Sequence, residues 1–163
     1  MQLGLGVAEG EGARMSDIDQ RLKKLGIELP AAKIPVANYL GTKRSGDLLF
    51  VSARVSQIRG EVGSDLTTDE AYQAARETMI HILAIIKVDI ELDAIESVDK
   101  MIGFVRSSPS FTEQPKVIDG ASDLLVEVFG ERGRHARTAT GVAQLPFGAA
   151  VQLELILRLR DGT

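Results

Sequence analysis

Hydrophobic and polar residues alternate with a period of two near the end of the chain. Over residues 149–160, one face carries Val151, Leu153, Leu155, Leu157 and Leu159, and the other carries Gln152, Glu154, Ile156 and Arg158. Such alternation predicts a strand with one face in the core. Further strands are predicted at 48–52 and 97–105, and the run at 48–52 lacks alternation, which is typical of a strand buried on both faces. Strand signals begin near Tyr39, and a turn is predicted at 44–47.

A period of 3.6 residues predicts two long helices. The first covers residues 69–87, begins with a capping box of Thr67 and Glu70, and has one apolar stripe formed by Ala71, Ala75, Met79, Ile82, Leu83 and Ile86. The second covers residues 114–129, is ended by Gly130, and has an apolar face formed by Val117, Ala121, Leu124, Leu125 and Val128. A shorter helix is predicted at 17–25, capped by Ser16 and stopped by Gly26.

The predicted elements follow the order β-β-α-β-α-β-β, with the short helix in front. Two amphipathic helices can cover only one face of one sheet, so this order predicts an α+β fold with both long helices on the same side. The strands around Phe50 and Phe104 nevertheless look apolar on both sides. We therefore expect other copies of the chain to cover the second face, in a homo-oligomer packed sheet to sheet.

The length of the chain and the character of its first residues bound the domain organisation. The 163 residues suit one domain, which we expect over residues 15–163. Residues 1–14 are rich in Gly and Glu and are expected to form a disordered leader, since Met15 looks like a more natural start. No apolar run approaches the roughly 20 residues that span a bilayer, and we recognise no signal peptide. We therefore expect a cytoplasmic protein.

Residue counts and net charge exclude several kinds of chemistry. The sequence has no cysteine, which rules out disulfides, thiolate metal sites and cysteine nucleophiles. It has only two histidines, so no metal site is expected. The formal net charge of -4 and the pI of about 5.2 argue against a broad nucleic-acid-binding face.

One segment, HARTATGVAQLP at residues 135–146, carries the strongest sign of a ligand. It places Arg137 at the mouth of a strand, and Leu145-Pro146 turns the chain into the last strand. Arginine is always charged and presents a planar fork of donors, which suits the carboxylate of a small molecule. The other interpretation is a strand-end arginine in a surface or interface salt bridge.

The order of elements and two segments resemble a known family. The strand sequence GDLLFVS at 46–52 and the segment from Ala136 to Pro146 are similar to the Rid (reactive intermediate deaminase, YjgF-like) family, over roughly residues 35–160. The resemblance implies a chorismate-mutase-like fold with a mixed sheet and two helices on one face. It also implies a homotrimer whose sheets form a barrel, with ligand clefts between subunits. The implied reaction is hydrolysis of enamine/imine intermediates such as 2-aminoacrylate to a 2-keto acid and ammonia, without a cofactor.

The resemblance further implies roles for individual residues. Arg137 falls on the arginine that pairs with the substrate carboxylate, Tyr39 is a candidate for the cleft lining, and Arg54 stands where the family often has glutamine. The family's catalytic glutamate, six residues after the proline of Leu-Pro, is Gln152 here, which can hold a water but cannot act as its base. Glu154 shares that strand face, roughly 7 Å further on, and is the other catalytic candidate.

Three functions stay open on this evidence. The first is an enamine/imine deaminase. The second is a trimer that binds a small carboxylate without turning it over, which Gln152 in place of glutamate favours. The third is a ribonuclease, as the family's older label "endoribonuclease L-PSP" suggests, but the acidic charge, the shortage of histidine and an aromatic content of only 4% argue against it.

Overall fold

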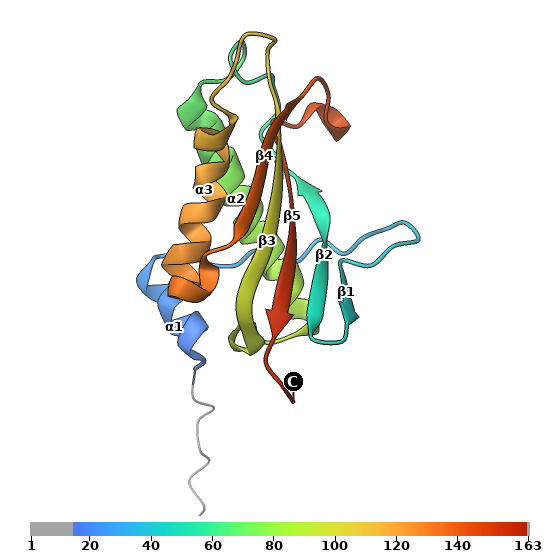
Figure 1. Ribbon diagram of the computed structural model, residues 1–163, viewed down its shortest axis with the longest axis vertical. Coiled ribbons are helices and arrows are strands. Elements are labelled where there is room, and N and C mark those ends of the chain that lie inside the picture. The colour runs from blue at the N-terminus through green and yellow to red at the C-terminus, as the bar shows by residue number, and fades with distance from the viewer. Residues whose placement is uncertain (1–14, 163) are drawn as a thin grey trace, which may run out of the picture.

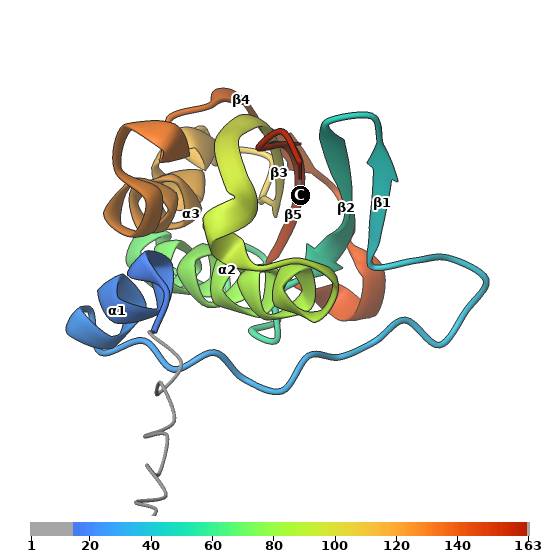
Figure 2. The same cartoon turned by 90° about the horizontal axis from the view of Figure 1, so that it is seen from below.

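A five-stranded sheet with two long helices on one face forms the body of the molecule (Figures 1 and 2). The computed structural model describes residues 15–162. The strands are β1 (Thr42–Ser45), β2 (Leu48–Val55), β3 (Ile95–Arg106), β4 (Ala136–Val142) and β5 (Val151–Leu159), arranged in the order β1-β2-β5-β3-β4. β3 and β4 pair in parallel, and the other neighbours pair antiparallel. The predicted α+β fold and the predicted order of elements are confirmed.

The helices begin and end where local sequence signals place them. α1 (Asp17–Lys24) begins after Ser16, whose side chain accepts a hydrogen bond from the backbone of Asp19. α2 (Thr68–Asp89) begins with the predicted capping box. α3 (Gln114–Phe129) ends at Gly130, where φ is +64°. Short 3-10 turns cover Leu92–Ala94, Gly130–Gly133 and Pro146–Gly148.

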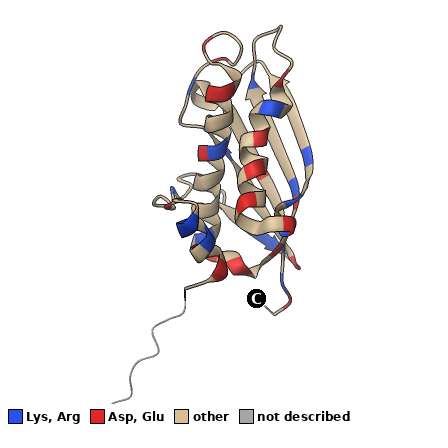
Figure 3. Ribbon diagram, turned by 90° about the vertical axis from the view of Figure 1, so that its left-hand side faces the viewer, with Lys and Arg blue, Asp and Glu red and all other residues tan. Residues whose placement is uncertain are grey.

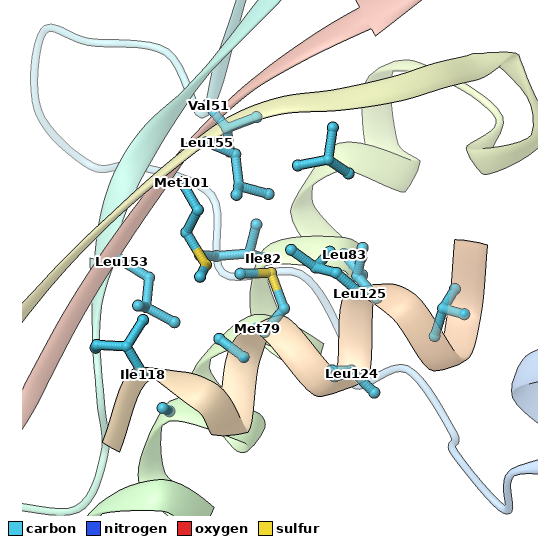
Figure 4. Packing of buried hydrophobic residues seen from close by; sticks show 14 of the residues in the cluster. Val51, Met79, Ile82, Leu83, Met101, Ile118, Leu124, Leu125, Leu153 and Leu155 are labelled. Carbon is cyan, nitrogen blue, oxygen red and sulfur yellow. The ribbon is translucent and has the colours of Figure 1, made fainter. Parts of the chain in front are cut away.

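The core lies between the two long helices and one face of the sheet (Figure 4). The apolar stripes of α2 and α3 are buried as predicted, and the five aliphatic residues of β5 all face them. Gly120 lets the helices approach closely, because a Cβ there would lie 2.1 Å from the carbonyl oxygen of Tyr72. The alternation in β5 therefore determines which face of the sheet the helices cover.

The opposite face of the sheet, called here the open face, keeps apolar residues that no described segment buries fully. Phe50 on β2 pairs with Ile156 on β5, and its side chain is 42% exposed. Ile102 and Phe104 on β3 are only half-buried. In the single chain, residues 48–52 are buried on one face only, because Leu49 and Val51 face the core while Phe50 faces outward. The expected cover of the second face by other copies of the chain stays a prediction.

A β-bulge interrupts β2 and changes the side on which its last residues lie. Val51 pairs with Leu155, but the next paired residue, Arg54, lies opposite Leu153. Three steps along β2 thus match two along β5, so Arg54 joins Val51 on the helix-covered face. Val55 then pairs with Gln152 on the open face.

The segment 26–41 links α1 to β1 and runs beside α2 (Figure 2). It exposes four apolar side chains, Ile34, Val36, Tyr39 and Leu40. β1 begins at Thr42, three residues after Tyr39, and the turn into β2 is confined to Gly46 and Asp47 rather than covering 44–47. The expected disorder of residues 1–14 concerns a segment outside the described residues.

Candidate functional site

Arg137 lies on the edge strand β4 and points toward α3. It pairs in register with Met101, a fully buried residue of β3, so both side chains lie on the helix-covered face. Its Nη1 donates to Oδ1 of Asp119 at 2.7 Å and to Oγ of Ser122 at 3.2 Å. Its Nε and Nη2 make no hydrogen bond to the described residues. Part of the donor fork is therefore available to a ligand.

His135 joins this cluster through Ser122. Its Nδ1 lies 2.7 Å from the carbonyl oxygen of Gly133, and its Nε2 lies 3.0 Å from Oγ of Ser122. A carbonyl can only accept, so Nδ1 carries the proton and Nε2 of the neutral ring is free to accept from the serine hydroxyl. Burial lowers the pKa of His135; the Gly133 carbonyl opposes this shift, and nearby Arg137 adds to it.

The hydrogen bonds form a directed chain from Arg137 through Ser122 to His135. The guanidinium donates to the serine oxygen, and the serine hydroxyl donates to the imidazole. A neutral histidine held in one tautomer beside a hydroxyl is the arrangement of a general base. The cluster thus combines a carboxylate-binding cation with a proton acceptor, which lie 3.2 and 3.0 Å from the Ser122 oxygen between them.

The two catalytic candidates on β5 lie elsewhere. Gln152 pairs with Phe104, and Glu154 pairs with Ile102, which places both on the open face. Arg137 lies beyond β3 and on the other face, so neither can act with it on one small ligand within a single chain. Within the chain, Glu154 is not the partner of Arg158, whose guanidinium pairs with Asp47 and Asp99.

Tyr39 and Arg54 are also separated from Arg137. Tyr39 precedes β1, at the opposite edge of the sheet from β4. Arg54 lies on the helix-covered face of β2 and lines a cavity together with His81 and Ile85 of α2. The five residues predicted from the sequence therefore occupy four separate places in one chain.

Sequence reasoning did not assign Asp119 or Ser122 to the site, and it gave His135 no committed role. Asp119 begins an acidic stripe on α3 with Asp123 and Glu127, each four residues from the next, visible as successive red bands in Figure 3. Asp123 accepts from the hydroxyl of Tyr72, and Glu127 pairs with Arg76. The four-residue spacing of these acids indicates that they share one face of α3. It does not show which of them contacts Arg137 on β4.

The described residues include neither a metal-binding cluster nor a helix that could span a membrane. Across residues 15–162, no group of three or more acidic or histidine side chains is arranged to hold a metal ion. No helix in this part of the chain is both long and apolar enough to cross a membrane.

The chain is similar to known proteins over most of its length. The model of the YjgF/chorismate mutase-like endoribonuclease family matches residues 19–158. Protein TCP17 of Trypanosoma cruzi is 45% identical over 148 residues, which cover 86% of this chain and 92% of that protein. The Atu1372 protein of Agrobacterium tumefaciens, of unknown function, is 42% identical with a TM-score of 0.81, covering 88% and 92% of the two chains. A Shewanella oneidensis structure is 31% identical with a TM-score of 0.84, covering 88% and 100%. Because the family model matches most of its length, the chain belongs to the YjgF/chorismate mutase-like family.

Proposed function

We propose that this protein binds a small carboxylate-bearing enamine or imine at Arg137 and hydrolyses it to a 2-keto acid and ammonia. The observation that carries the proposal is the guanidinium of Arg137, which donates through Nη1 only and lies beside the Ser122–His135 pair. Asp119 accepts from Nη1 alone, so a ligand carboxylate can take the remaining nitrogens as a bidentate partner. This is the class of reaction that the resemblance of the Arg137 segment to the Rid family implies.

The reaction on this site needs one proton acceptor. An enamine substrate first takes a proton from solvent on its terminal carbon and so becomes the iminium. With the ligand carboxylate on Arg137, the adjacent iminium carbon would lie next to Ser122, where a water can attack it. The water oxygen forms a bond to that carbon, and one of its protons passes through the serine hydroxyl to Nε2 of His135. The imidazolium returns the proton to the amine nitrogen of the tetrahedral intermediate. His135 then accepts the proton of the new hydroxyl group as the C–N bond breaks, and the nitrogen leaves with the bonding electrons as ammonia. The imidazolium finally protonates the ammonia, so ammonium and the 2-keto acid leave. His135 thus supplies the base that Gln152 cannot.

The proposal includes a homotrimer, which is typical of the family. The open face supplies the reason, because Phe50, Ile102, Phe104 and Ile156 lie on it and stay half-buried or exposed in the single chain. Closing three sheets into a barrel would cover these residues. It would also bring the β4 edge of one copy beside the β1 edge of the next, and so place Tyr39 near the partner's Arg137.

A second candidate function is carboxylate binding without turnover. Gln152 favours it, since the position implied for a catalytic glutamate holds a side chain that does not titrate. The acidic stripe of α3 beside Arg137 gives no support to a ribonuclease, because Asp119, Asp123 and Glu127 would repel a phosphate backbone.

Replacing Arg137 by Ala should remove ligand recognition. We expect kcat/KM for 2-aminoacrylate generated in situ, followed by ammonia release, to fall about 10–100-fold, because a charged hydrogen-bonded pair is lost. Arg134→Ala is the matched control, since Arg134 lies on the neighbouring turn with its side chain 71% exposed. Equal rates for the Arg137 variant and the native protein would contradict the proposed site.

Replacing His135 by Gln should lower kcat about 100-fold and leave KM almost unchanged. Because the pKa of His135 is lowered from 6.5, the ring is neutral at pH 7. The native kcat should therefore fall only as the pH drops below 6.5, and the variant should lose this dependence. His81→Gln serves as the control. A His135 variant with the same kcat and the same pH profile as the native protein would exclude His135 as the base.

Introducing a charge on the open face should dissociate the assembly. We expect Phe50→Asp to sediment as a monomer at micromolar concentration, while the native protein sediments as a trimer, because a buried carboxylate would have no partner. Val88→Asp, at an exposed position on α2, should remain trimeric. If the Phe50 variant stays trimeric, the open face is not the interface.

The Gln152→Glu variant separates the two candidate functions. If His135 is the base, the native protein turns over 2-aminoacrylate, and this substitution changes kcat by less than about threefold, within the range of a small electrostatic effect. If the native protein only binds, turnover should appear in Gln152→Glu and not in Gln144→Glu, an exposed control. Absence of turnover in the native protein and in both variants would reject the deaminase and leave binding.

A further inference from the structure

A second cationic site lies on the helix-covered side of the sheet, between α2, the end of β2 and the 3-10 turn Pro146–Gly148. A cavity of about 610 Å³ opens there, a size that suits a small organic ligand. It lies beside β2 and α2, whereas Arg137 lies on β4 at the far edge of the sheet and contacts α3. The cavity is therefore separate from the proposed carboxylate site within the chain.

The cavity wall carries three permanent positive charges and no acid among the described residues. Lys33, Arg54 and Arg59 line it, and none of them forms an ion pair with the part of the chain that the structure describes. By contrast, Arg76, Arg137 and Arg158 each have a carboxylate partner. Although the chain has a net charge of -4, three cations without a neighbouring carboxylate create a local positive potential. Such a potential attracts anions.

Among the three cations, Arg54 supports an anion site most strongly. Its Nε and Nη2 are shut off from solvent and have no hydrogen-bond partner in the described chain. The guanidinium lies under Gly41 and Ile85, since Nη2 is 3.8 Å from the place a Cβ on Gly41 would take. Burying charged donors without partners is costly. The two buried nitrogens do not face the open cavity, so an anion there would meet the guanidinium through Nη1 and would compensate a charge that has already lost part of its water.

His81 and Phe147 complete the site. Nε2 of His81 lies 3.2 Å from the amide nitrogen of Gln57, and burial lowers the pKa of His81, with Lys33 adding to the effect and Glu77 opposing it. Phe147 has φ of +59°, is 79% exposed and also lines the cavity. The wall thus combines three cations with one exposed aromatic side chain.

We infer that this cavity binds a small phosphate monoester with a planar or apolar body. A carboxylate has one charge, whereas a phosphate monoester has close to two at neutral pH and three acceptor oxygens, which match Lys33, Arg54 and Arg59. The ring of such a ligand would lie against Phe147. This assignment is independent of the proposed deaminase activity, since it uses none of the residues around Arg137.

Titration calorimetry of the full chain with phenyl phosphate, inorganic phosphate and benzoate tests the inference. We expect phenyl phosphate to bind once per chain and more tightly than the other two. Arg54→Met and Lys33→Gln should each weaken binding at least about tenfold, as expected for loss of a charged hydrogen bond. Phe147→Ala should abolish the preference for phenyl phosphate over inorganic phosphate. Lys116→Gln, which removes a charge from exposed α3, should bind as the native protein does.

A stability measurement separates a ligand site from a structural role for Arg54. Without ligand, Arg54→Met should raise Tm by about 2–4 °C, because unpaired buried donors are removed, whereas a structural arginine would lower it. Binding that is lost in Arg137→Ala but kept in Arg54→Met would place the anion at the other site and overturn the inference. So would equal weakening by Lys116→Gln, displacement of phenyl phosphate by a short oligoribonucleotide, or no binding at millimolar concentration.

Discussion

The parallel pairing of β3 with β4 is the constraint on which the candidate site depends. Two parallel neighbours need a crossover connection, and α3 supplies it. The register sets Arg137 beside buried Met101, which forces the guanidinium toward α3 rather than toward the open face. Asp119, Ser122 and His135 then meet it because they lie on the crossover helix and on the turn that leads back into β4. Shifting this register by one residue would turn Arg137 away from all three.

Hydrophobic periodicity was sufficient to predict the elements and their order. The apolar stripes of α2 and α3 and the alternation of β5 each describe a single buried face, so local pattern and global fold agree. Arg137 could be identified from its segment because a permanent charge at the mouth of a strand needs a partner. Its partner inside the chain could not be identified, because Asp119 comes 18 residues earlier and meets it only through the packing of α3 on the sheet.

The position of Arg54 shows a second limit of the pattern. Regular alternation from Val51 would put residue 54 on the open face, beside Gln152. The bulge at Ser52 and Ala53 adds one residue to β2 and reverses the side. Nothing in the sequence around these two residues distinguishes a bulge from a regular strand. Within one chain, Arg54 therefore lies on the opposite face of the sheet from Gln152, and a cleft completed by a second subunit stays a prediction.

The two arginines differ in how their charges are balanced, and this difference argues for two kinds of binding. Arg137 already has Asp119, so an incoming carboxylate at that site competes with or joins an existing anion, and recognition there rests on geometry. Arg54 has no carboxylate partner in the described chain and has lost solvent at two nitrogens, so an anion in the cavity would meet a charge that is uncompensated and already partly desolvated. A site of the first kind suits a substrate that must leave after reaction. A site of the second kind suits a ligand that stays bound, and it stabilises the folded chain in proportion to its occupancy.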